Sequence, residues 1–331
     1  MAESLNLANI GSELQDIATD NKDHFFDGVY GVGETDADTA NSIPSMAEYA
    51  AELDTPNEVV LTNVYAAGAW QPGGKKTASG KVFNPTADAV ALTPRVAKVE
   101  HVAMTFLFEQ AVLVLLKKSY LSGVRANSIN ADEIPFGQYL LNNLMMKAKE
   151  ELRLAYFQAI HNAEGTAYTA LFDGYRKQIL DAIVSGDIPA GNVIDTAVIS
   201  ATTGVAVMED IVDGIPTKYL NSLVCLCSRQ AKRFYEKDYR TRYGTLPYNN
   251  GMTKSFIDGS GIEFMVEPGL DGFDRPLFVP RNNFVRLYDS SDNANLTIDY
   301  DARERDIAVV VDGQAGCGFA NGEHIWTNDN V

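Results

Sequence analysis

Cysteine and histidine are scarce in this sequence, and their scarcity limits its chemistry. The chain has 331 residues but only three cysteines, Cys225, Cys227 and Cys317, too few and too unevenly spaced for a disulfide framework. Reduced thiols in a cytoplasmic setting are therefore expected. Cys225 and Cys227 lie too close together for two ligands of a tetrahedral metal site, and no histidine has a partner at ligand spacing. We expect no metal and no cofactor.

Positive charge and long apolar runs are also scarce. The sequence has 27 basic and 44 acidic residues, and its formal net charge of −17 is the wrong sign for tight binding of DNA or RNA. The N-terminal MAESLNLANIGSELQD lacks the basic start and apolar segment of a secretory signal. Glu109 and Gln110 interrupt the most apolar stretch, residues 102–116, so we interpret it as core. We expect no membrane association.

Recognisable catalytic motifs are absent as well. No serine, cysteine or carboxylate stands in a nucleophile or acid–base motif, so we expect no catalytic residues and no enzyme activity. The sequence GGKKT at residues 73–77 is an incomplete phosphate-binding loop. Ala69 occupies the position of the first glycine, Lys76 replaces the required Ser or Thr, and no helix pattern follows. A solvated or contact-making loop is the simpler interpretation.

The longest helical pattern runs over residues 135–162, and the other segments are organised around it. Its apolar residues recur at steps of three and four and predict one buried side, made of Leu141, Leu144, Met145, Ala148, Leu152, Ala155, Tyr156 and Ala159. We expect the remaining surface to be solvated by Lys147, Lys149, Glu150, Glu151 and Arg153. At 1.5 Å per residue, this helix would be roughly 40 Å long.

The segments before this helix predict an arm and a hairpin. Residues 1–56 are polar and carry too little apolar surface for a core, so we expect an extended arm with a short helix near residues 45–53. The following stretch is rich in Val, Leu and Tyr, breaks at QPGGKKTASGK and then resumes. This pattern predicts a long hairpin whose tip projects away from the body.

The segments after the long helix predict a mixed unit. Tyr175, Ile179, Leu180 and Ile183 indicate a second amphipathic helix. We expect further helices at residues 204–212 and 228–238, and strands at residues 222–227, 261–266 and 276–279. Finally, LTIDYDARERDIAVVVDGQAGCGFA predicts two strands joined by a polar turn, which return beside the long helix. The predicted fold class is α+β.

A cluster of aromatic and basic residues follows in the predicted helix and loop near residue 240. It contains Tyr235, Lys237, Tyr239, Arg240, Arg242, Tyr243 and Tyr248. Such a cluster is typical either of a platform for single-stranded nucleic acid or of a protein contact loop. The overall acidity of the chain favours the contact loop.

The order of arm, projecting hairpin, long helix, mixed unit and late strands resembles that of the major capsid proteins of tailed bacteriophages, which have the Hong Kong ninety-seven capsid fold. The resemblance covers most of the chain. Its segments are PFGQYLLNNLMMKAKEELRLAYFQAIHNAEGT, LFDGYRKQI, FYEKDYRTRYG, IDGSGIEFMVEPGLDG, LFVPRNNFVRLYD and RERDIAVVVDGQAGCGFANGEHI.

This resemblance implies a division of the chain. Residues 1–56 would be the N-terminal arm and residues 57–107 the E-loop hairpin. Residues 108–165 would form the peripheral domain, with the spine helix at residues 135–162, and residues 291–315 would add strands to it. Residues 166–290 would be the axial domain and residues 316–331 a C-terminal segment.

The resemblance also implies a function and partners. The chain would assemble with copies of itself into hexamers and pentamers of an icosahedral shell that encloses double-stranded DNA, without sequence-specific contact to it. It would be located in the virion capsid, after assembly in the host cytoplasm. A separate scaffolding protein and a portal would be further partners, and decoration or head-completion proteins could join them. Two alternatives stay open, which are an encapsulin-type compartment shell and a soluble enzyme with an unrecognised site.

Candidate intersubunit contacts follow from the hairpin tip and from the aromatic cluster. They are Lys75, Lys76, Lys81, Tyr239, Arg240, Arg242 and Tyr243. Some members of the family cross-link a lysine of the hairpin tip to an asparagine of a neighbour. Asn282 and Asn283 are the candidate acceptors, although no feature of the sequence identifies such a pair.

Overall fold

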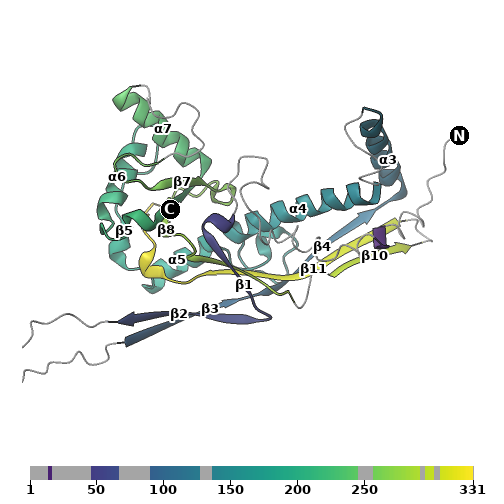
Figure 1. The fold of residues 1–331 in the computed structure, drawn as a ribbon, viewed down its shortest axis with the longest axis horizontal. Helices are drawn as coiled ribbons and strands as arrows, with labels where there is room; N and C mark the ends of the chain where they lie inside the picture. Colours follow the sequence, from purple (N-terminus) through teal and green to yellow (C-terminus); the bar gives the residue numbers. More distant parts are fainter. Residues whose placement is uncertain are drawn as a thin grey trace, which may run out of the picture.

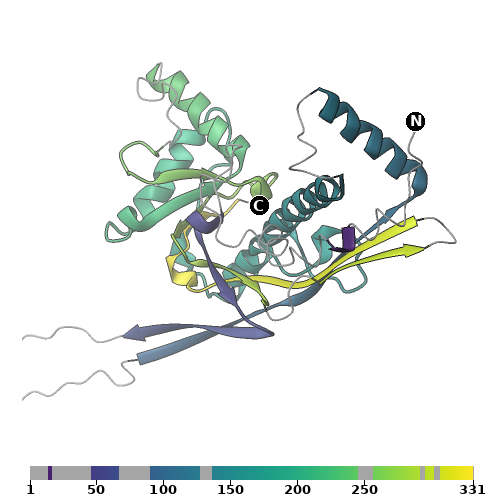
Figure 2. The same ribbon diagram turned by 45° about the vertical axis from the view of Figure 1, so that its right-hand side comes forward.

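The structure, a computed structural model, describes residues 14–16, 46–66, 90–126, 136–244, 256–290, 295–301 and 306–330. Figure 1 shows one long helix, α4 (Phe136–Gln158), lying along a sheet that contains β4 (Glu100–Phe108), β10 (Asn295–Asp301) and β11 (Asp306–Phe319). A unit of helices and short strands stands at one end of α4. The other end lies near a separate helix, α3 (Gln110–Arg125), in both views (Figures 1 and 2).

The sheet under α4 has five strands and is built on β11. This strand pairs antiparallel with β4 on one side, and with β10 and then β9 (Phe284–Tyr288) along its length. The fifth strand, β1 (Ala50–Asp54), pairs parallel with β9. Exposure alternates along β4, as expected when only one face of a sheet is covered.

Helix α4 confirms the predicted long helix and most of its buried side. Leu141 and Leu144 pack with Ile298, Ile307 and Val309 of β10 and β11. Ala148, Leu152, Ala155 and Tyr156 continue the buried side into a larger core. The core that contains Leu141 and Leu144 also includes Leu14. Leu14 is fully buried against residues of α3 and α4 and therefore connects residues 14–16 to the body.

The helix ends four residues earlier than predicted, at Gln158 instead of Asn162. Beyond this point, the amides of Ile160 and Asn162 donate hydrogen bonds to the carbonyls of Thr169 and Ala170. Thr169 and Ala170 belong to the short helix η2 (Tyr168–Ala170), so the backbone forms a tertiary contact in place of another helical turn. Such a contact is not visible in helical periodicity.

The predicted hairpin is confirmed for its two strands. β2 (Glu58–Ala66) and β3 (Val90–Lys98) pair antiparallel over nine residue pairs, and they project from the body in Figure 1. At the base, Leu61, Ala97 and Val99 form a small core with Val285 and Leu287. Gly316 of β11 allows the end of β3 to approach closely, because a Cβ at Gly316 would lie 2.1 Å from the carbonyl oxygen of Lys98.

The unit at the end of α4 away from α3 is built on a three-stranded sheet in the order β7 (Glu263–Val266), β6 (Leu223–Cys227) and β8 (Leu277–Pro280). Every residue of β6 is buried, and its two faces supply different cores. Val224 and Leu226 join the core that contains α4, whereas Cys225 and Cys227 face the core under α6 and α7. Cys225 and Cys227 are therefore buried together on one side of a strand.

The remaining elements agree closely with the predicted order. Helix α5 (Tyr175–Ser185) and helix α6 (Gly204–Gly214) occur where expected, whereas α7 (Arg229–Tyr243) runs five residues beyond the predicted end at Asp238. The short pieces are η1 (Met46–Glu48), η3 (Ala190–Asn192), β5 (Val193–Ile194), η4 (Leu220–Ser222), η5 (Pro268–Leu270), η6 (Gly322–His324) and β12 (Thr327–Asn328). β5 and β12 pair parallel as a separate two-stranded sheet.

The helix predicted for residues 45–53 is wrong. Only η1 is helical there, and the chain continues as β1. Tyr49 and Ala50 are buried, and the β1 backbone pairs with β9 over five residues. Tertiary pairing therefore overrides a weak local helical pattern.

Arg153 was predicted to lie on the solvated side of the long helix, and this prediction is also wrong. Its Nη2 lies 2.7 Å from Oε2 of Glu267, whose side chain is only 1% exposed, and its Nε donates to Oε1 at 3.1 Å. The hydroxyl of Tyr49 donates to Oε2 of Glu267 at 2.6 Å. These three side chains form a buried polar network that joins the segment before β1, α4 and the segment after β7.

The network shifts the pKa values of its tyrosine and its arginine. Burial, followed by the negative charge of Glu267, raises the pKa of Tyr49 well above its usual value. Burial is the largest effect and lowers the pKa of Arg153, but the hydrogen bonds and charge of Glu267, together with Tyr49, outweigh it and leave the pKa raised. The tyrosine therefore remains a neutral donor and the arginine a cation.

We predict that Glu267→Ala lowers the free energy of unfolding of the unassembled subunit by about 3–5 kcal/mol, because it leaves Arg153 buried without its counter-charge. Chemical denaturation followed by circular dichroism measures this change. The matched control is the double variant Arg153→Met, Glu267→Met, which removes both charges and should be less destabilised than Glu267→Ala. Equal destabilisation of the two variants would contradict a role for the charge pair.

Candidate functional site

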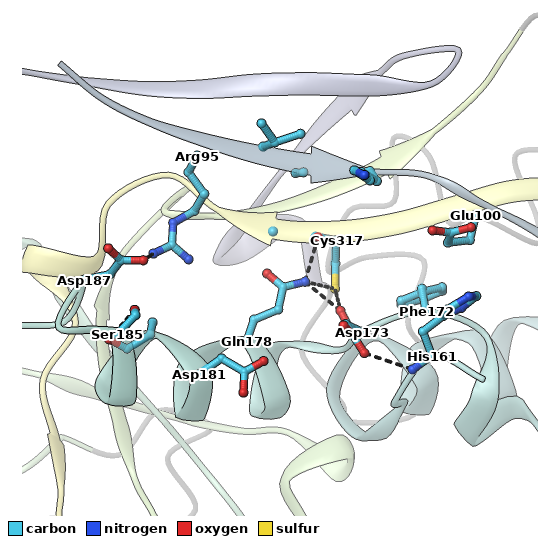
Figure 3. A pocket seen from close by; sticks show the side chains of 15 residues that line it. Arg95, Glu100, His161, Phe172, Asp173, Gln178, Asp181, Ser185, Asp187 and Cys317 are labelled. Atoms are coloured by element: carbon cyan, nitrogen blue, oxygen red, sulfur yellow. Dashed lines mark hydrogen bonds and ion pairs between the residues drawn. The ribbon is translucent and has the colours of Figure 1, made fainter. Parts of the chain in front are cut away.

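A pocket of about 380 Å³ lies between the base of the hairpin and the body (Figure 3). β3 and β11 form one wall, and α5 with the segment after α4 forms the other. Residues of both walls carry polar groups, among them Arg95, His161, Asp173, Gln178 and Cys317. A thiol, an imidazole and a carboxylate line this pocket together, so we test whether they are arranged for catalysis.

The hydrogen bonds in the pocket connect its two walls. Nε2 of Gln178 donates to the carbonyl oxygen of Asp173 at 2.6 Å and to that of Cys317 at 2.9 Å. The backbone amide of His161 donates to Oδ1 of Asp173 at 2.9 Å. The polar groups are thus used to hold α5 and the segment after α4 against β11.

The thiol of Cys317 is not arranged as a nucleophile. It donates to the carbonyl oxygen of Asp173 at 3.3 Å, and burial, followed by the charge of Asp173, raises its pKa well above the usual value. Nδ1 of His161 donates to the carbonyl oxygen of Leu171 at 2.9 Å. A catalytic thiolate needs a lowered pKa and a base within hydrogen-bonding distance. The thiol in this pocket is instead kept neutral.

Arg95 fixes the hairpin to the body across this pocket. Its Nη2 lies 2.7 Å from Oδ2 of Asp187, just beyond α5, and its guanidinium carbon lies 3.8 Å from the centre of the Phe319 ring. Figure 3 shows this side chain reaching from β3 toward Asp187. The two partners of this ion pair are 92 residues apart and stand in no motif, so the sequence offered no signal for it.

The aromatic and basic cluster near residue 240 lies on helix α7, so its interpretation as a loop is wrong for the described residues. Tyr239 donates to Oδ2 of Asp258 at 3.1 Å, and Arg242 pairs with Asp238 at 2.9 Å. Nε of Arg240 donates to the carbonyl oxygen of Glu236, whereas Tyr243 is 61% exposed. Of the four predicted contact residues on α7, Arg240, Arg242 and Tyr243 are exposed, and Tyr239 is half-buried.

The alternative of a nucleic-acid platform requires exposed rings on which bases can stack. Tyr235 is 5% exposed and packs against Phe264. Burial raises its pKa to about 12, and its hydroxyl accepts a hydrogen bond from the amide of Asp258. Tyr235 is therefore part of the core, and Tyr248 lies outside the described residues. This arrangement disfavours the platform.

The candidate cross-linking residues are only partly described. Lys75, Lys76 and Lys81 lie outside the described residues. Asn283 is 6% exposed, and its side chain both donates to the carbonyl and accepts from the amide of Asn321, so it is not available to a neighbour. Asn282 is exposed and adopts a φ of 64°. It stays a candidate acceptor, and Asn283 does not.

Among the described residues, no group of three or more His, Cys, Asp or Glu side chains is placed to hold a metal ion. None of the described helices has the length and apolarity needed to cross a membrane.

We predict that none of the three cysteines reacts with Ellman's reagent at pH 8 in the folded subunit, and that all three react after unfolding. All three are buried away from the reagent, and burial raises the pKa of the Cys225 and Cys317 thiols, so these two are not thiolates near neutral pH. Fast labelling of the native protein that disappears in Cys317→Ala would contradict this prediction and restore the hypothesis of a reactive thiol in the pocket.

Comparisons with known proteins identify similarity at the level of structure. Neither the known family models nor the curated proteins include a match to this sequence. A chain of Mycobacterium phage Ogopogo matches with 16% identity and a TM-score of 0.53, over 86% of this chain and 91% of its own length.

Two other similar structures have lower scores. A chain of the satellite phage P4 procapsid, solved with the size determination protein, has 11% identity and a TM-score of 0.49, over 85% of this chain and 90% of its own. A chain of the holo-SrpI encapsulin complex from Synechococcus elongatus has 12% identity and the same TM-score, over 85% of each chain.

The Ogopogo match covers nearly the whole described architecture. The order of elements is also that of the resemblance: a hairpin, then a long helix over a sheet, then a mixed unit, and a late strand pair that returns beneath the helix (Figure 1). At this level of identity the match defines the fold. The chain therefore has the Hong Kong ninety-seven capsid fold.

Proposed function

We propose that this chain is the major capsid protein of a tailed bacteriophage, a shell subunit that assembles with copies of itself into hexamers and pentamers. The observation that carries the proposal is the β2–β3 hairpin. Its strands project from the body, and their pairing partners are each other along nine residue pairs. An arm of this kind contributes contact area to a neighbour more than it does to its own core.

The two faces of the hairpin differ in the way that this role requires. Leu61 and Ala97 face inward and pack on Val285 and Leu287 of the body. Val60 and Val96 are directly opposite one another on the two strands, and they are 51% and 50% exposed. An exposed cross-strand apolar pair on a projecting ribbon is a liability for a monomer, and a second copy would cover it.

We assign the parts of the chain accordingly. The hairpin corresponds to the E-loop of residues 57–107, and α4 to the spine helix of the peripheral domain, residues 108–165. The unit built on β6 lies in the axial domain, residues 166–290. Residues 291–315 return to the peripheral domain, and residues 316–331 form the C-terminal segment. Residues 1–56 are assigned to the N-terminal arm; residues 1–13 and 17–45 lie outside the described residues, and residues 50–54 are the strand β1 of the body.

The proposed partners follow from this role. The shell would enclose double-stranded DNA, and a net charge of −17 suits a container that holds a polyanion without gripping it. A scaffolding protein and a portal would take part in assembly in the host cytoplasm, and decoration or head-completion proteins could join the virion. The role is structural, and we assign no catalytic residue.

We predict that deletion of residues 71–85 separates folding from assembly. The deleted residues lie beyond the last pair of the β2–β3 ladder, Ala66 with Val90, so the core contacts of Leu61 and Ala97 remain. The melting temperature of the unassembled subunit should change by only a few degrees, whereas closed particles should no longer form, because the same contact is lost at every junction.

Thermal unfolding and negative-stain imaging measure the two parts of this prediction under conditions in which the intact chain forms particles. Normal particles from the deletion variant would exclude the hairpin as an intersubunit arm. Unfolding of the variant would instead place the deleted residues in the core. Images of the intact chain also distinguish a genome-sized shell from a small compartment filled with cargo.

A further inference from the structure

Helix α7 presents a basic stripe in an acidic protein. It carries six of the 27 basic residues of the chain, against only two acidic residues. Ala231, Tyr235 and Asp238 are buried, so the helical repeat places Arg229, Arg233, Lys237 and Arg240 on the opposite, outward face. Within the described part of the chain, the side chains of Arg229, Arg233 and Lys237 have no hydrogen bond or ion pair.

Helix α6, the neighbour of α7, presents the opposite charge. Its buried side is formed by Val205, Val207, Met208 and Ile211. Glu209, Asp210 and Asp213 are exposed on the other side, and none of the three forms an ion pair with another described residue. Figures 1 and 2 both place α6 and α7 on the outside of the unit at the end of α4 away from α3, where a second molecule can reach them.

The stability of the individual helices does not explain either charge pattern. Anions are favourable at the first turn of a helix and cations at the last turn, because of the helix dipole. Arg229 and Lys232 lie in the first turn of α7, which has no acidic residue, and Asp213 lies in the last turn of α6, which has no basic residue. Arg240 and Arg242 in the last turn of α7 agree with this preference, but the first-turn cations of α7 and Asp213 at the end of α6 oppose it, so helix stability does not explain the charges at these positions.

We propose that the basic stripe of α7, Arg229, Arg233 and Lys237, docks on the acidic face of α6, Glu209, Asp210 and Asp213, of a second copy of this chain. The inference rests on the proposed shell function and identifies one of its contacts. Each subunit carries both halves of the contact, so the contact can repeat from copy to copy. Complementary charges of this kind set the register and speed of association.

A nucleic acid is the competing partner for a basic stripe. It would also be attracted to the cations of α7, but it would be repelled by the adjacent acidic face of α6 and by the net charge of −17. The presence of an equal and opposite face on the neighbouring helix favours a second copy of the chain. The two partners give different results when α6 is changed.

The test uses three variants of the full chain at exposed positions. The first is Arg233→Glu with Lys237→Glu, the second is Asp210→Lys with Asp213→Lys, and the third combines all four changes. The first two variants change the net charge by equal amounts in opposite directions, and the third restores it. Circular dichroism and thermal unfolding of the unassembled subunits check that each variant folds.

Assembly is measured by sedimentation velocity and negative-stain imaging over a series of salt concentrations. We expect each of the first two variants to lower the fraction of subunits in particles by about tenfold at low salt, because the contact then joins like charges. The third variant should regain wild-type assembly, since the reversed faces are again complementary. Added salt should weaken assembly of the wild type.

Three outcomes would overturn the inference. Wild-type assembly of the first variant would show that the stripe makes no such contact. Failure of the combined variant to regain particles would exclude α6 as the partner of the stripe. Normal empty particles of the first variant that no longer retain DNA would assign the stripe to nucleic acid. Absence of particles from the wild type would instead overturn the proposed function, and this contact with it.

Discussion

The carboxylate of Glu267 is the point on which the arrangement of the described chain depends. It is almost completely buried and accepts hydrogen bonds from Tyr49, from Arg153 and, at 3.3 Å, from the amide of Gly269. A buried carboxylate is strongly unfavourable unless charges and donors surround it. Its cost is offset only when the segment before β1, helix α4 and the segment after β7 are all in place. The network thus links three distant parts of the sequence in one cooperative structure.

The other polar groups near α4 serve a similar structural purpose. Gln178 and Cys317 satisfy backbone carbonyls between α5 and β11, and Arg95 connects the hairpin to Asp187. These side chains are of the types used in active sites, but each is engaged in holding one element against another. The polar side chains of the pocket therefore hold the hairpin and α5 against the body, and their role is structural.

The distribution of surface groups suits association with other copies. The hairpin exposes an apolar cross-strand pair, and the far end of the molecule separates basic from acidic residues on two adjacent helices. Apolar contact supplies most of the free energy of association, whereas charge selects orientation and register. An elongated subunit with both features at separate places can form repeated contacts with its neighbours.

The sequence alone determined the elements that have a strong period. Leu141, Leu144 and Leu152 predicted the buried side of α4, the segment LTIDYDARERDIAVVVDGQAGCGFA predicted β10 and β11, and a strand at residues 222–227 predicted β6. These patterns are local, because each reflects the face that one element turns to the core. The resemblance of several segments to capsid proteins then predicted the fold that the structure has.

Only the tertiary structure decided which partner each side chain meets. Residues 50–54 form a strand because β9 offers them an edge, and Arg153 leaves the solvated side because Glu267, 114 residues away, is buried beside it. Asn283 is buried, and its side chain forms hydrogen bonds with the backbone of Asn321. Helix α7 extends to Tyr243, so the described residues of the aromatic cluster lie on a helix and not on a loop. Long-range pairing of this kind leaves no trace in local periodicity, because it depends on residues that only folding brings together.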